Sequence, residues 1–190
     1  MNKTRVLTSI TAMLMALTPV GSFAGDTTIG ALIGVASMDS GIGTKLGLGA
    51  QVRHKIIQPF SIGANFNYAN YSGAFAGMVV DSNGVATNVS GTVNNKIMHI
   101  DADLIYNADT LLPGLWAGAR LGIGIITSST SVPGLNFPST NAFEFGPTAG
   151  YDYNFMESLS VGIDLSYLFA SYSGSSLRTF QGLAALRFHL

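Results

Sequence analysis

The stretch Leu159-Ser160-Val161-Gly162-Ile163-Asp164-Leu165-Ser166-Tyr167 decides the fold, because every second residue in it is apolar and each residue between is small or polar. A period of two predicts a β-strand with one apolar face and one polar face. The same phrase occurs earlier as Phe60-Ser61-Ile62-Gly63-Ala64-Asn65-Phe66-Asn67-Tyr68. We therefore expect the fold to be built from strands of this kind, each with an aromatic residue at one end of its apolar face.

The first residues have the pattern of a secretory signal peptide. Lys3 and Arg5 precede a mostly apolar segment at 6–20, and Ser22-Phe23-Ala24 provides small residues at the positions that a signal peptidase reads. The alternative is a retained membrane helix, but the segment is short for spanning and contains several Thr and Ser residues. We expect residues 1–24 to be removed and residues 25–190 to form one domain.

The composition favours an exported membrane protein that crosses the bilayer with strands. Only 10% of the residues are charged, against about 25% in typical soluble domains, and mean hydropathy is +0.38. After the signal peptide, no apolar run approaches the ~20 residues of a membrane helix. The apolar residues must then be dispersed over many strands, as in a membrane barrel. The net charge of −1 gives no polybasic surface, so we expect no nucleic-acid partner.

The alternation predicts eight strands, an even number, as is typical of membrane barrels. The predicted strands cover 28–38, 44–54, 60–71, 96–106, 115–126, 142–153, 159–172 and 177–190. Longer polar stretches at 73–94 and 128–140 are expected to be external loops, while 55–59, 107–114 and 154–158 are short links at the other end, together with both chain ends. The predicted fold is all-β: an eight-stranded antiparallel up-and-down transmembrane β-barrel.

Closing the sheet into a barrel is the physical requirement behind this prediction. An open sheet in lipid leaves edge N–H and C=O groups unpaired at a cost of several kcal/mol each. Aromatic residues near the strand ends are expected to form two girdles on the exterior: Phe60, Tyr106, Tyr153, Phe155 and Phe188 at one end, and Tyr71, Phe143, Phe169 and Tyr172 at the other. The alternative, a soluble eight-stranded barrel, would place its apolar face inside.

The charged strand residues fall on the polar face, which is the lumen of the predicted barrel. This predicted lumen charge network consists of Lys45, Arg53, Asp101, Asp103, Arg120, Glu144, Asp152, Asp164 and Arg187. An eight-stranded lumen is just wide enough for side chains to fill, and buried charges need partners. We expect Arg53, Arg120 and Arg187 to pair with the acidic residues, whereas the alternative is a lining that selects ions. The sequence does not say which pairs form.

Three smaller features leave alternatives open. Abundant inward glycines, such as Gly122 and Gly150, would leave space for a narrow pore. The stretch at 73–94 contains Ser82-Asn83-Gly84, a hairpin turn signal, so it is a loop, a hairpin that extends the third and fourth strands, or two further strands of a ten-stranded barrel. His54, His99 and His189 are scattered, and no serine is clearly placed beside them, so we expect neither an enzyme nor a metal site.

The chain resembles the small bacterial outer-membrane β-barrels, the group that includes OmpA-type membrane domains, OmpX and OmpW. The resemblance rests on residues 150–155 leading into 159–167, on Ala117-Gly118-Ala119-Arg120-Leu121-Gly122-Ile123-Gly124, and on the closing Leu186-Arg187-Phe188-His189-Leu190. The last segment is similar to the C-terminal signal read by the outer-membrane assembly machinery, carried here by Leu186, Phe188 and Leu190. Members of the group commonly end in Phe, whereas this chain ends in Leu190.

The resemblance implies a location in the outer membrane of a Gram-negative bacterium and contact with membrane lipid, lipopolysaccharide and the assembly machinery. From the residues themselves we expect no cofactor and no enzyme activity. We expect a structural or surface-interaction role, with a lumen filled by ion pairs and with 73–94 and 128–140 as display surface. The alternative is a porin-like narrow channel, or an OmpW-like route, for small or hydrophobic molecules.

We predict that replacing Phe188 and Leu190 by Asp blocks membrane assembly, because the change removes the apolar face of the C-terminal signal. Surface exposure of the variant, measured by protease accessibility on intact cells, checks this. A variant that reaches the surface at wild-type levels would rule out a signal at this terminus.

Overall fold

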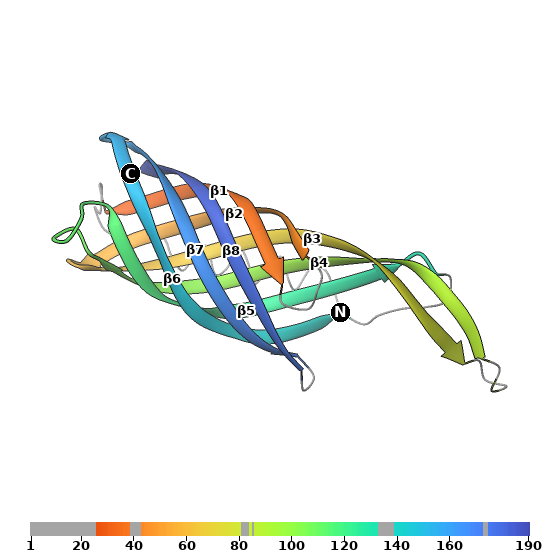
Figure 1. The fold of residues 1–190 in the computed structure, drawn as a ribbon. Helices are drawn as coiled ribbons and strands as arrows, with labels where there is room; N and C mark the ends of the chain where they lie inside the picture. Colours follow the sequence, from red (N-terminus) through yellow and green to blue (C-terminus); the bar gives the residue numbers. More distant parts are fainter. Residues whose placement is uncertain (1–25, 39–42, 81–83, 85, 133–138, 173–174) are drawn as a thin grey trace, which may run out of the picture.

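A computed structural model describes residues 26–38, 43–80, 84, 86–132, 139–172 and 175–190. These residues form eight strands: β1 (Thr27–Met38), β2 (Gly43–Ile57), β3 (Phe60–Val80), β4 (Ala86–Asn107), β5 (Leu115–Thr130), β6 (Thr140–Met156), β7 (Leu159–Tyr172) and β8 (Ser175–His189). Each strand pairs antiparallel with the next, and β1 also pairs with β8, so the sheet closes on itself (Figure 1). The predicted eight-stranded antiparallel barrel is confirmed. The predicted signal peptide lies outside the described residues.

In the described part of the chain, no helix has the length and apolar character needed to span a membrane.

The side chains of each strand alternate between the exterior and the lumen. On β6, Phe143 and Phe145 are 62% and 56% exposed, whereas Glu144 between them is 1% exposed. This arrangement is the reverse of a soluble barrel, whose apolar face points inward. An exterior of this kind suits a hydrocarbon surrounding, where apolar side chains gain nothing by burial inside the protein.

Both ends of the described chain lie at one end of the barrel, which we call the terminal end. There Lys55 N donates to Asp26 O at 2.8 Å, and Leu190 N donates to Thr27 O at 2.9 Å. The short links β2–β3, β4–β5 and β6–β7 are at this same end. The opposite end, which we call the hairpin end, carries the long projection formed by β3 and β4 (Figure 1).

The stretch at 73–94 is not a loop, so that prediction is wrong. β3 and β4 continue through it and remain paired from Gly73↔Val93 to Val80↔Ala86. The ten-stranded alternative is also wrong, because the barrel closes with eight strands. The hairpin alternative is the one found: Gly84 has a φ of +79°, a left-handed conformation that glycine adopts without strain. At 128–140, β5 runs to Thr130 and β6 begins at Thr140, whereas 133–138 lie outside the described residues.

One of the predicted girdle aromatics faces the other way. Tyr71 is completely buried in the lumen, where it packs in a cluster with Met38, Ala69 and Ile97. The reason is strand parity, since Tyr71 continues the inward series of Asn65, Asn67 and Ala69. The remaining predicted girdle residues whose side chains are described lie on the exterior: Phe60, Tyr106, Tyr153, Phe155, Phe188, Phe143 and Phe169.

We predict that the folded protein migrates faster on a gel before boiling than after it, because an uninterrupted ring of strand pairs resists detergent unfolding. Deleting residues 175–190 should abolish the fast band, since β1 and β7 then lose β8 as a partner. Equal mobility of boiled and unboiled wild-type protein would contradict a stable closed barrel.

Candidate functional site

The lumen near the terminal end is crossed by two arginines that share two aspartates. On β2, Arg53 donates from Nη1 to Asp152 Oδ2 at 3.2 Å and from Nη2 to Asp164 Oδ2 at 3.0 Å. On β8, Arg187 pairs with the same two carboxylates through Nη1 and Nη2. Because the aspartates come from β6 and β7, the ion pairs of Arg53 connect opposite walls of the barrel, whereas those of Arg187 join neighbouring strands of one wall.

A third arginine forms a separate bidentate pair. Arg120 donates to Asp103 from Nε at 2.7 Å and from Nη2 at 2.9 Å, and the two residues lie directly opposite each other on β5 and β4. Both are almost completely buried. A guanidinium in this geometry satisfies both carboxylate oxygens at once.

Amide side chains join these two groups into one network. Arg187 Nε donates to Gln51 Oε1 at 3.0 Å, and Gln51 Nε2 donates to Asn65 Oδ1 at 2.6 Å. Asn65 Nδ2 in turn donates to Asp103 Oδ2 at 2.6 Å. The network therefore runs without a break from Arg187 to Arg120. Neither amide was among the predicted lumen residues, because an uncharged residue on the polar face shows no signal beyond the alternation.

The two acidic residues nearer the hairpin end, Glu144 and Asp101, have no arginine partner within the described strands. His99 Nδ1 lies 2.8 Å from Glu144 Oε1, and both residues are buried. Asp101, which the sequence places two residues from His99, is also buried, and neither of its oxygens has a hydrogen-bond partner among the described residues. The lumen thus holds more carboxylates than guanidinium groups, and the excess lies on this side.

Lys45 does not join the network. It lies on β2 and is half-buried, and no carboxylate of the described residues is within ion-pair distance of it. Of the nine predicted lumen residues, Lys45 is the one closest to the hairpin end of its strand. The described residues also contain no group of three His, Cys, Asp or Glu side chains that could hold a metal ion.

An apolar cluster occupies the lumen at the hairpin end. It consists of Ala36, Met38, Ala69, Tyr71 and Ile97, with Ile126 and Leu177 packed against it. This cluster was not predicted, because its members interrupt the polar face only near the strand ends. The lumen therefore has an apolar layer at one end and a polar, charge-paired layer at the other.

The inward glycines do not leave empty space where large side chains need it. The indole of Trp116 lies over Gly150, the residue opposite it on β6. The carboxylate of Asp101 lies over Gly122, its opposite residue on β5. These glycines admit bulky neighbours, so a pore cannot be inferred from their abundance.

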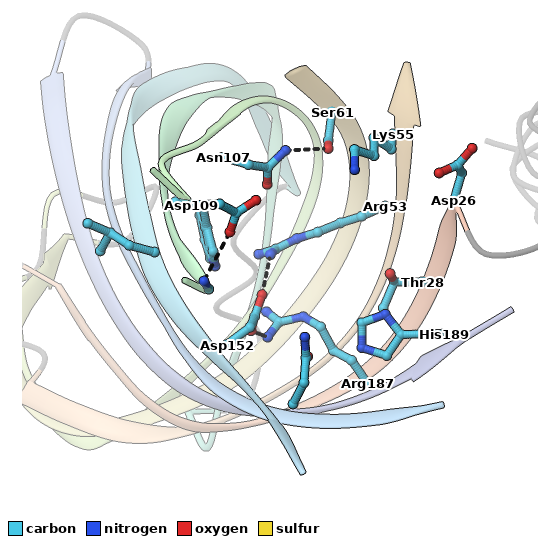
Figure 2. A pocket seen from close by; sticks show the side chains of 14 residues that line it. Asp26, Thr28, Arg53, Lys55, Ser61, Asn107, Asp109, Asp152, Arg187 and His189 are labelled. Carbon is cyan, nitrogen blue, oxygen red and sulfur yellow. Dashed lines mark hydrogen bonds and ion pairs between the residues drawn. The ribbon is translucent and has the colours of Figure 1, made fainter. Parts of the chain in front are cut away.

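The floor of a pocket at the terminal end is formed by residues of the arginine–aspartate group. The pocket has a volume of about 230 Å³, and Figure 2 shows Arg53 reaching across it to Asp152, with Arg187 and His189 on the adjoining wall. The guanidinium of Arg53 also stacks on the ring of Trp116, with its carbon 3.8 Å from the ring centroid. Trp116 was not among the predicted site residues, although its parity on the strand placed it inward.

Two hydroxyl–imidazole contacts occur at the terminal end, where the sequence showed no clear neighbour for any histidine. Ser160 Oγ lies 2.9 Å from His189 Nε2, and Thr27 Oγ1 lies 3.0 Å from His54 Nδ1. Ser160 is completely buried, so a substrate has no access to its hydroxyl. A nucleophile also needs such access and an oriented base together.

Solved structures with the same fold are small outer-membrane barrels. The chain is similar to Neisserial surface protein A (14% identity, TM-score 0.58, 86% of this chain and 97% of that one). It is also similar to the attachment invasion locus protein Ail of Yersinia pestis, in complex with the heparin analogue sucrose octasulfate (16%, TM-score 0.51, 86% and 97%). A third match is a major outer membrane protein from Thermus thermophilus (12%, TM-score 0.57, 87% and 98%).

These likenesses confirm, at the level of fold, the predicted resemblance to the small outer-membrane barrels. No family model matches the chain, and neither does any curated protein.

We predict that Arg120→Met lowers the free energy of unfolding by about 3 kcal/mol, because it leaves the buried Asp103 carboxylate without its cation. The double variant Arg120→Met/Asp103→Leu should lose less, since no unpaired charge remains. Reversible urea unfolding in lipid vesicles measures both, with Lys96→Met on an exposed position as the control. A double variant less stable than the single one would show that the pair is not the source of the loss.

Proposed function

We propose that this protein is a bacterial outer-membrane barrel with a closed lumen, whose role is to present the β3–β4 hairpin to partners outside the cell. The observation that carries the proposal is the contrast between the two parts. The lumen is occupied by buried ion pairs and an apolar cluster, whereas the hairpin projects beyond the barrel with both of its edges free of other described strands.

The exterior supports the membrane location. Large apolar side chains are exposed around the barrel, among them Leu46, Ile33, Leu104, Leu121, Phe143 and Ile163, which would cost free energy in water. In the outer membrane they contact lipid and, in the outer leaflet, lipopolysaccharide. The exposed Leu186, Phe188 and Leu190 on β8 and at the terminus are available to the assembly machinery. The terminal end then faces the periplasm and the hairpin end faces the outside.

The free edges of the hairpin follow from the register. Pairing between β2 and β3 ends at Gly47↔Ala69. Pairing between β4 and β5 ends at Val93↔Thr130, and beyond it Ser131 N still donates to Thr92 O. Asn107 N donates to Pro59 O at the base of the ladder, so odd-numbered residues of β3 direct their main-chain groups toward β4. The even-numbered ones, including Ser72, Ala74 and Ala76, therefore direct theirs outward.

The composition of the hairpin leaves these edges unprotected. Proteins usually shield an edge with charges, proline or bulges, but the only charged residue at 73–94 is Asp81, and the segment contains no proline. An edge of this kind accepts an extended segment as an additional strand. We therefore assign the surface-interaction role to strand pairing at the hairpin.

We expect the partner of this chain to differ in charge from the ligand of one structural relative. The Ail protein was solved with a heparin analogue, a polyanion. In this chain neither 73–94 nor 128–140 contains a lysine or arginine, so these two segments offer no cation of their own to a polyanion. An extended peptide segment fits the hairpin better.

The channel alternative is less well supported. The network that links Arg187 to Arg120 occupies the lumen, and the apolar cluster lies across the route to the hairpin end. We propose neither enzyme activity nor a cofactor, since the serine beside His189 is buried.

We predict that the folded barrel gives no stable conductance in a planar bilayer, because ions would have to displace buried ion pairs. Protein verified as folded by its unboiled gel mobility is the required material. A reproducible conductance would favour the channel.

We also predict that the protein binds a subset of β-prone decapeptides on an array and that Ala74→Pro reduces this binding at least tenfold. Proline removes an outward N–H without breaking a bond to β4. The matched control, Ala74→Thr, keeps the N–H and should bind as well as the wild type. Equal loss in both variants would point to the side chain instead of the edge.

A further inference from the structure

The pocket at the terminal end contains two buried hydrogen-bond donors without an acceptor. They are Nε of Arg53 and Nε1 of Trp116, and neither has a partner among the described residues. Arg53 is 8% exposed and Trp116 is 2% exposed. Leaving a buried donor unpaired costs roughly 1–3 kcal/mol, so these groups mark a place where an acceptor is expected.

Arg53 and Trp116 both line the same cavity, which is open at the terminal end and has a volume of about 230 Å³. Their planes are stacked on each other, so the two N–H groups belong to one rigid unit. Asp152 and Asp164 hold the terminal nitrogens of Arg53, which fixes the guanidinium and leaves Nε as its free position. Figure 2 shows Lys55 above Arg53 on the same side of the pocket.

The charge of the lining limits what the acceptor can be. At the floor, Arg53 and Arg187 are matched by Asp152 and Asp164. The lining also includes Lys55, Asp26 and Asp109. No excess of positive charge is present among these described residues for a phosphate dianion, whereas a single carboxylate would gain two N–H donors and the charge of one lysine.

We propose that this pocket binds a carboxylate of a small molecule or of a peptide end, with Arg53 Nε and Trp116 Nε1 donating to its oxygens and Lys55 attracting it at the rim. Leu115, which also lines the cavity, provides an apolar surface for a short carbon chain next to the carboxylate. The site is independent of the hairpin, because it lies at the opposite end of the barrel.

The chain offers a direct probe of this proposal, since Trp116 is its only tryptophan. The folded barrel in detergent micelles should give one indole N–H signal by ¹⁵N-resolved NMR. Titration with acetate should shift that signal in a saturable way, whereas the neutral isostere acetamide should not. A short peptide with a free C-terminal carboxylate, compared with its amidated form, tests whether a peptide end is accepted as well as a free acid.

Two variants connect the shift to the proposed donors. Arg53→Lys keeps the charge but removes Nε, and it should weaken acetate binding about tenfold, the effect of losing one charge-assisted hydrogen bond. Lys55→Gln leaves the buried network intact and should weaken binding severalfold. Lys96→Gln, at an exposed position on β4, is the control and should bind as the wild type does.

The outcomes separate clearly. Saturable binding of acetate that Lys55→Gln weakens supports the proposal even if Arg53→Lys fails to fold. A linear drift without saturation, or equal shifts with acetate and acetamide, would overturn it and leave the two donors to solvent water. Wild-type affinity for acetate in both Arg53→Lys and Lys55→Gln would also overturn it.

Discussion

The pairing of β1 with β8 is the constraint on which the rest of the structure depends. It runs from Thr28↔His189 to Met38↔Thr179 and removes the last two unpaired edges of the barrel wall. In a hydrocarbon surrounding each unpaired backbone group costs several kcal/mol, so an open sheet has no stable form there. Because the ring is closed, every strand must send one face outward and the other into a narrow lumen.

This closure decides where charge can lie. The exterior is left mainly to apolar side chains, and most of the charged residues of the barrel wall are confined to a lumen only as wide as side chains can fill. Buried charges are tolerated when they are paired and hydrogen-bonded, and the arginine–aspartate group with its bridging amides satisfies this condition. The same crowding explains the glycines opposite Trp116 and Asp101, because a larger residue at either position would overlap the neighbouring side chain.

Much of the fold could be predicted because a period of two is a strong local signal. It predicted the eight strands and the inward positions of Arg53, Arg120 and Arg187. Contacts that depend on stagger between strands could not be predicted: His99 bonds Glu144 on β6 and not Asp101 on its own strand, and Lys45 lacks a carboxylate among the described residues. The polar composition of 73–94 led to the prediction of a loop, but a two-stranded hairpin outside the barrel needs no apolar face and can be equally polar. Tyr71 was misplaced because an aromatic near a strand end was assigned to a girdle without counting its parity.

The hydrogen bonds of the lumen have a consequence for the order of assembly. Arg187 is bonded to Gln51, which is 136 positions away in the sequence, and Arg53 is bonded to Asp164, 111 positions away. No nascent portion of the chain that lacks β8 can form the contacts of Arg187, so a partly inserted sheet would hold Asp152 and Asp164 without it. Insertion and closure of the barrel are thereby coupled into one cooperative event. A truncated chain without β8 is destabilised because Asp152 and Asp164 then lack one of their two arginine partners.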